Sequence, residues 1–108
     1  MIGWLVLVAS LTVTPPPPAA TGVLIATGPN TRVLVWKSVA AMAEGRSLLR
    51  AQADVNRIIP LVACTPLSGT AAIEAADEPG DALCGVLVTQ GEWAGCRGVV
   101  EAEYFKRP

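Results

Sequence analysis

Histidine is absent from this chain of 108 residues, and aromatic residues make up only 5% of it. Histidine is the commonest general base and metal ligand near neutral pH, so its absence removes the usual centre of acid–base and zinc chemistry. The eight basic residues are scattered and the net charge is -1, which leaves no basic surface for nucleic acid. We therefore expect a protein that is not an enzyme, that needs no cofactor or metal ion, and that has no nucleic-acid partner.

The remaining composition is that of a folded domain. Hydrophobic residues account for 52% of the chain, a fraction too high for a disordered protein. The length leaves room for one domain and a short appendage.

The first thirteen residues carry no charged side chain, and four prolines follow at positions 15–18. As a helix, residues 1–13 would be roughly 20 Å long, which is shorter than the roughly 30 Å hydrocarbon core of a membrane. Their length fits the apolar part of a secretory signal peptide, so residues 1–20 are interpreted as a signal or anchor segment with a proline-rich spacer. A β-strand and a mis-assigned start codon are the other two interpretations. We expect a periplasmic or secreted protein, and a membrane tether through residues 1–13 if the segment is kept.

Residues 21–57 separate this segment from the C-terminal half. Two apolar runs on either side of a turn at residues 28–31 predict a β-hairpin over residues 21–36, or else an extended linker. Residues 37–57 are predicted as a helical segment, with the helix itself over residues 38–53. Ser38 is the expected cap, and Val39, Met42 and Leu49 fall near one apolar stripe. Gly45 is expected to weaken this helix by about 1 kcal/mol relative to alanine.

Residues 58–108 alternate short apolar runs with turns, which predicts four to five strands. The runs cover residues 58–64, 69–76, 83–89 and 96–101, with a turn at residues 77–81 and a short turn or strand at residues 104–106. Short connections favour antiparallel pairing, and a small barrel closes such a sheet and removes its edges. The predicted fold class is mainly β (α+β): a small antiparallel β-barrel preceded by one α-helix and an apolar N-terminal segment.

Several glycine-containing motifs accompany these strands. They are Gly69-Thr70, Gly85-Val86-Leu87-Val88, Gly91-x-x-Ala94-Gly95-Cys96-Arg97-Gly98-Val99-Val100 and a closing Tyr104-Phe105. The series resembles the bacterial SH3-like domains of exported proteins, although Val99 stands where that family usually has tryptophan. The resemblance implies an SH3-like barrel over residues 58–108. It also implies a recognition module that binds peptides, cell-wall fragments or protein partners.

The three cysteines, Cys64, Cys84 and Cys96, include no Cys-x-x-Cys pair. A disulfide is expected in an exported chain, and loop-closure entropy gives about 2.9–3.7 kcal/mol for each of the three pairings, values too similar to choose between. Cys64 and Cys96 both lie at predicted strand ends beside a turn, so we expect a Cys64–Cys96 disulfide and a buried Cys84. Three reduced core cysteines are the alternative, which is typical of a reducing compartment.

Trp93 is the strongest candidate binding residue. It stands in a predicted loop between two glycines, where a tryptophan either covers the barrel mouth as a lid or faces outward as an interaction anchor. We group Glu92, Arg97 and Tyr104 with it as the predicted ligand-binding residues. The predicted function is a non-catalytic binding module of an exported or membrane-tethered bacterial protein, which recognises a peptide, cell-wall or protein partner. The alternative is a structural or accessory subunit that pairs with a neighbour through its apolar N-terminal arm.

Overall fold

The described part of the chain is built on one antiparallel sheet of seven strands accompanied by two α-helices. A computed structural model describes residues 20–74 and 83–108, so the expectations for the signal or anchor segment and for the turn at residues 77–81 lie outside the described residues. The fold is mainly β with added helices, which confirms the predicted α+β class at this level.

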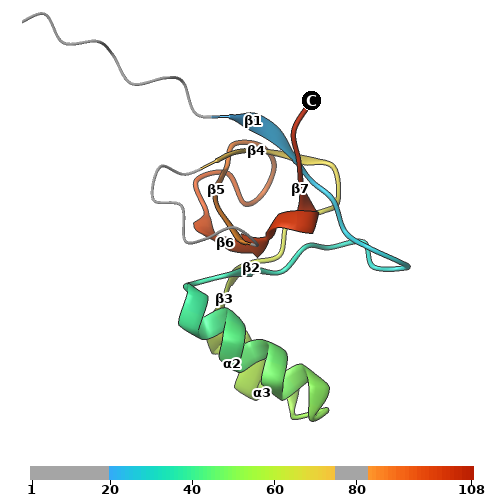
Figure 1. Ribbon diagram of the computed structural model, residues 1–108, viewed down its shortest axis with the longest axis vertical. Coiled ribbons are helices and arrows are strands. Elements are labelled where there is room, and N and C mark those ends of the chain that lie inside the picture. Colours follow the sequence, from blue (N-terminus) through green and yellow to red (C-terminus); the bar gives the residue numbers. More distant parts are fainter. Residues whose placement is uncertain (1–19, 75–82) are drawn as a thin grey trace, which may run out of the picture.

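Along the chain, two strands come first, the two helices follow, and the remaining five strands complete the sheet (Figure 1). They are β1 (Thr21–Leu24), β2 (Val35–Trp36), α2 (Val39–Arg50), α3 (Val55–Ile58), the 3-10 turn η2 (Ile59–Leu61), β3 (Val62–Cys64), β4 (Thr70–Glu74), β5 (Leu83–Val88), β6 (Arg97–Glu101), the 3-10 turn η3 (Ala102–Tyr104) and β7 (Phe105–Lys106). The strands pair in the order β3-β2-β6-β5-β4-β1-β7. Among the described strands, β3 and β7 therefore form the two edges, and the predicted closure of the sheet into a barrel is not present.

The hairpin predicted over residues 21–36 is wrong. A turn does form at Gly28 and Pro29, but β1 pairs with β4 and β7, whereas β2 pairs with β3 and β6. Leu24 explains the long-range partner of β1, because its side chain is completely buried among residues of the later strands. Strands from before and after residue 58 thus share one sheet.

The strand predicted over residues 58–64 is right only for its last three residues. Asp54 begins a helical turn here, because its carboxylate accepts a hydrogen bond of 2.9 Å from the backbone N–H of Asn56. Pro60 then occupies the first turn of η2, where its missing N–H is not needed. The chain becomes extended only at Val62 and forms the edge strand β3.

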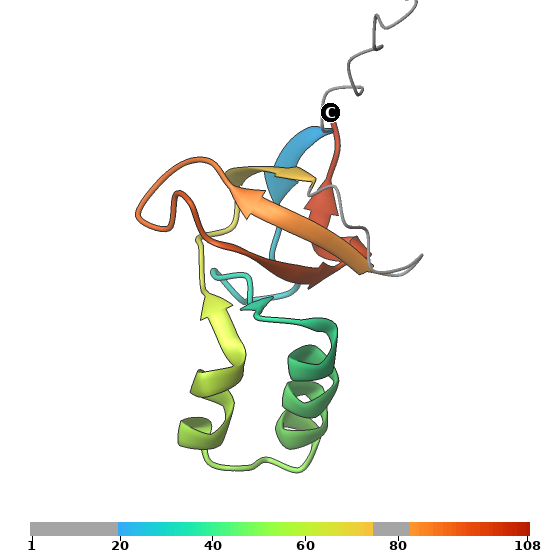
Figure 2. The ribbon, with the colours of Figure 1, turned by 90° about the vertical axis from the view of Figure 1, so that its left-hand side faces the viewer.

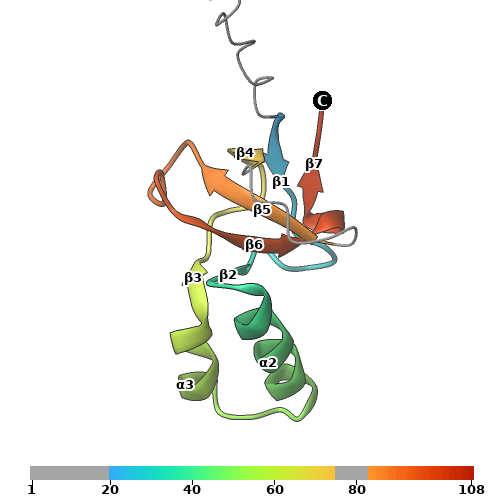
Figure 3. The ribbon, with the colours of Figure 1, turned by 60° about the vertical axis from the view of Figure 1, so that its left-hand side comes forward.

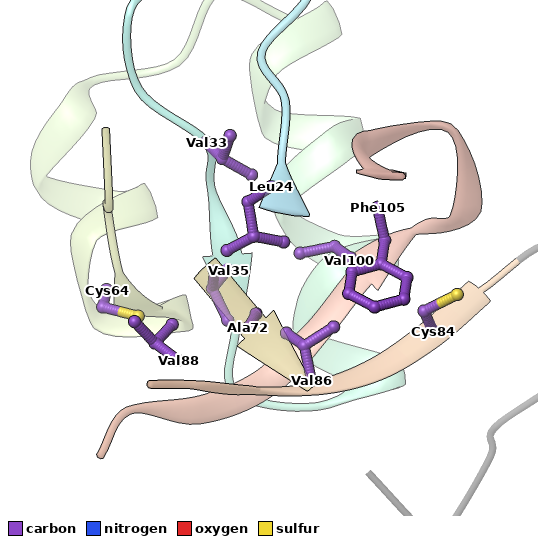
Figure 4. Packing of buried hydrophobic residues seen from close by; sticks show 10 residues of the cluster. All are labelled: Leu24, Val33, Val35, Cys64, Ala72, Cys84, Val86, Val88, Val100 and Phe105. Atoms are coloured by element: carbon purple, nitrogen blue, oxygen red, sulfur yellow. The ribbon is translucent and has the colours of Figure 1, made fainter. Parts of the chain in front are cut away.

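The main core lies inside the curl of the sheet, where alternate residues of neighbouring strands meet (Figure 4). On β5, Cys84, Val86 and Val88 are buried at a spacing of two, as one face of a strand requires. Cys84 also stands opposite the buried Val100 of β6 in the register. The full buried cluster comprises Leu24, Val33, Val35, Cys64, Ala72, Cys84, Val86, Val88, Val100 and Phe105.

The helices pack at one end of the sheet, and the start of β1 and the C-terminus lie at the other end (Figures 1, 2 and 3). Ser38 caps α2 as predicted, because its hydroxyl accepts a hydrogen bond of 3.0 Å from the backbone N–H of Ala41. The helix ends at Arg50, three residues earlier than predicted, and α3 follows after a short turn. No helix within residues 20–74 and 83–108 is long and apolar enough to span a membrane.

Gly45 is a packing requirement, not the weakness that helix propensity predicts. The buried residues of α2 are Met42 and Gly45, whereas Val39 and Leu49 of the predicted apolar stripe are exposed. A Cβ atom at position 45 would overlap the indole ring of Trp36, which is 97% buried (3% exposed). The glycine therefore lets α2 approach the sheet closely enough to cover Trp36.

Replacing Gly45 by alanine tests this packing. Helix propensity alone predicts a gain of about 1 kcal/mol, but the overlap with Trp36 should instead lower the free energy of unfolding by about 1–3 kcal/mol. Denaturant unfolding measures the change, with Ser47→Ala on the exposed face of the same helix as the control. A Gly45→Ala protein that is as stable as the wild type would contradict the proposed contact.

Candidate functional site

An apolar groove of about 370 Å³ runs between Trp93, α3 and β3, and we call it the Trp93 groove. Its walls come from three separate parts of the chain: the segment before β2, the segment from α3 to β3, and the loop between β5 and β6. The lining residues are Leu34, Val55, Ile58, Ile59, Val62, Ala63, Cys64, Thr65 and Trp93. No charged residue lines it, so the groove suits an uncharged apolar group.

The loop between β5 and β6 holds Trp93 on one side of the groove. Figures 2 and 3 show this loop reaching out from the sheet on the side of β3. Gly91 and Gly95 have φ angles of 79° and 94°, which favour glycine, so the loop can turn back on itself. The N–H of Gly95 donates to the carbonyl of Val88 at 2.8 Å, and the N–H of Cys96 donates to the carbonyl of Trp93 at 2.9 Å. The indole is thus presented by a closed, hydrogen-bonded turn.

A disulfide between Cys64 and Cys96 links β3 to the end of the Trp93 loop, as the sequence predicted. It connects β3 to the residue that precedes β6 across a separation of 32 residues. Cys84 lies outside the disulfide, buried in the main core. The bond therefore limits how far the Trp93 loop can move from the edge of the sheet.

Arg32 provides a second link between these segments, and sequence reasoning missed it. Its guanidinium donates from Nη1 to the backbone carbonyl of Thr65 and to Oε1 of Glu92, both at 2.8 Å. Both side chains are about half exposed, so the ion pair contributes little to global stability, at most about 1 kcal/mol. Its effect is local, because it holds the Glu92–Trp93 turn beside the segment that follows β3.

Four large apolar side chains of the groove are exposed to solvent. Val55 is 60% exposed, Ile59 58%, Leu34 37% and Trp93 36%. Single exposed apolar residues are ordinary, but several gathered around one concavity are typical of an interaction site. Sequence reasoning identified only Trp93 among them. Leu34 lies in the segment predicted as a hairpin or linker, Val55 in the predicted helical segment and Ile59 in a predicted strand.

The predicted ligand-binding residues do not form a single cluster. Trp93 and Glu92 are neighbours at the loop and line a second, small pocket of about 50 Å³ beside the Trp93 groove. Tyr104 lines a different pocket of about 120 Å³ together with Arg46 and Glu101. Arg97 begins β6 with an exposed side chain and lines none of these three pockets. The structure brings together Trp93 and Glu92 only.

The Trp93 groove can bind by burying apolar surface, and the polar side-chain groups of its lining are the hydroxyl of Thr65 and the indole N–H of Trp93. Within residues 20–74 and 83–108, no three Cys, Asp or Glu residues gather in a way suited to a metal ion.

Reduction of the disulfide gives a test of this arrangement. Under denaturing conditions without reductant, a thiol reagent should modify one cysteine per chain, Cys84, and all three after reduction. Removing the link with Cys64→Ser and Cys96→Ser together should lower the free energy of unfolding by about 2–4 kcal/mol, because the unfolded chain regains loop entropy. Three reactive thiols in the protein purified without reductant would contradict the bond.

Compared with known proteins, the chain matches no family model, no curated protein and no solved structure. Its function therefore has to be inferred from the Trp93 groove and the residues that hold it.

Proposed function

We propose that this chain is a non-catalytic binding module of an exported or membrane-tethered bacterial protein, and that the Trp93 groove recognises a peptide, cell-wall or protein partner. The observation that carries the proposal is the cluster of four exposed apolar side chains around one uncharged concavity. Water is displaced from such a surface when a partner covers it, and a rigid tryptophan is well suited to the centre of the contact.

The order of the later strands supports an SH3-like arrangement as the finer description of the fold. Gly69-Thr70 leads into β4, the apolar β5 pairs with it, and β6 follows as the next antiparallel neighbour. On this proposal, β4, β5 and β6 correspond to the second, third and fourth strands of an SH3-like domain. The first strand of this arrangement would be β1 in place of residues 58–64, because β1 is the strand that pairs with β4.

The disulfide supports an extracytoplasmic location. Disulfides form and persist in oxidising compartments, so the Cys64–Cys96 bond is compatible with one. A periplasmic or secreted location is the proposal that follows, with the apolar residues 1–13 as its export or tethering signal.

A second candidate function is that of a structural or accessory subunit. The observation in its favour is chemical similarity: residues 1–13 carry no charged side chain, and neither does the lining of the Trp93 groove. In this version the N-terminal arm contacts a neighbouring subunit instead of being removed.

Substitutions in the groove test the binding function. Ligands are selected on the wild-type protein from a displayed peptide library and from a panel of soluble cell-wall fragments. Trp93→Ala or Ile59→Ser should then weaken binding by at least about tenfold, because each removes exposed apolar surface from the groove. Titration calorimetry or a binding sensor measures the change.

Val39→Ser is the matched control, because Val39 is 41% exposed and lines none of the three pockets. The control should bind as the wild type does. The assignment of the groove would be contradicted if Val39→Ser lost as much affinity as the groove variants. It would also be contradicted if Trp93→Ala and Ile59→Ser left the affinity unchanged.

A further inference from the structure

The Trp93 groove follows the open edge of the sheet. β3 pairs with β2 and with no other described strand. Consecutive side chains of a strand point to opposite faces, yet Val62, Ala63, Cys64 and Thr65 all line the groove. The groove therefore lies along the outer side of β3 and not over one face of the sheet. The unpaired backbone N–H and C=O groups of an edge strand point toward that outer side.

An open strand edge beside an apolar groove favours the binding of an extended peptide as an additional strand of the sheet. The backbone of an extended peptide can hydrogen bond to the edge, while its alternate side chains enter the adjoining pocket. Val55, Ile59 and Trp93 all line the groove, and all three are exposed. Because no charged residue lines the groove, the added strand should be uncharged along its length.

The chain itself contains a segment with these properties. Residues 2–13 hold no charge, and β-favouring residues such as Trp4, Val6 and Val8 occupy alternate positions, with Leu5 and Leu7 on the intervening ones. Twelve residues exceed the three of β3, so the segment has length to spare for contacts with Trp93 and α3.

The place where the segment joins the sheet favours the groove of a different copy. β1 begins at the end of the sheet opposite the helices, whereas the groove lies beside α3 (Figures 1 and 3). Four consecutive prolines precede Ala20, and such a spacer is semi-rigid, which disfavours a fold back across the chain's own sheet.

We propose that residues 2–13 of one copy add as a strand to the open edge of β3 in a second copy and fill its Trp93 groove. This rests on the proposed binding role of the groove and on the second candidate function, in which residues 1–13 are kept, and it names the partner. The contact joins two different surfaces, an arm and a groove, so the copy that donates its arm keeps an open groove and the copy that accepts it keeps an unused arm. Copies therefore assemble head to tail.

A complementation experiment on the full chain tests the proposal. Ile59→Asp places a charge in the groove at a position 58% exposed, where folding should tolerate it. Leu7→Asp places a charge in the arm. Sedimentation velocity of intact 108-residue protein, checked by mass, should show assembly of the wild type and a monomer for each variant alone.

An equimolar mixture of the two variants should form a dimer and stop there. The Ile59→Asp copy supplies an intact arm to the intact groove of the Leu7→Asp copy, and the two remaining surfaces are both disabled. Val39→Asp and Thr14→Asp, placed outside groove and arm, should assemble as the wild type does.

Three results would overturn the proposal: a monomeric wild type, assembly that survives either aspartate, or a mixture that remains monomeric. In the last case the arm acts on its own copy or on another surface. If the mixture is monomeric while Trp93→Ala still abolishes capture of a selected ligand, this inference fails and the proposed function stands. If the mixture is monomeric and Trp93→Ala also leaves ligand capture unchanged, the groove is not a binding site.

Discussion

The covalent link between Cys64 and Cys96 is the constraint on which the candidate site depends. The edge strand β3 and the Trp93 loop belong to parts of the chain that are 32 residues apart, and Arg32 provides a second link between their neighbourhoods. The disulfide fixes one end of the groove, and Arg32 holds the adjoining turn through Thr65 and Glu92. Because both contacts act on the loop, the indole of Trp93 is held opposite the strand edge, where a partner would meet it.

The second constraint is the contact between Trp36 and α2. Trp36 belongs to β2, the strand next to β3, and Met42 and Ile58 cover it from the two helices. Gly45 permits this contact by leaving room for the indole. The position of α3, and with it Val55 and Ile59 of the groove, is therefore set by a small core distinct from the one inside the sheet. Two cores and one disulfide together define the walls of the groove.

Local pattern was sufficient to predict the later strands and the disulfide. β4, β5 and β6 carry apolar residues bounded by turns, and Cys64 and Cys96 lie at the ends of such runs. Pairing over long distances was not predictable in this way. Nothing in the residues of β1 indicates that its partner begins about 46 residues later, because antiparallel partners are selected by burial in the finished core. Pro60 and Asp54 carried a signal for the helical turn that the apolar run of residues 58–64 concealed.

The candidate site was predictable only in part for the same reason. Trp93 and Glu92 were identifiable because a tryptophan between glycines stands out locally. Arg32, Leu34, Val55 and Ile59 become parts of one surface only after the chain has folded. Tyr104 was grouped with Trp93 in the prediction, but the structure places it after β6, where it lines a separate pocket beside Arg46 and Glu101.

Residue-resolved hydrogen exchange in the oxidised and the reduced protein tests most directly whether the disulfide builds the groove. The amides of Gly95 and Cys96 are hydrogen bonded within the Trp93 loop, and the amide of Val86 belongs to the central strand β5. Reduction should raise exchange at Gly95, Cys96 and β3 by at least about tenfold while Val86 stays protected, because local opening needs less free energy than global unfolding. Unchanged exchange in the loop, or an equal rise throughout the sheet, would contradict the account.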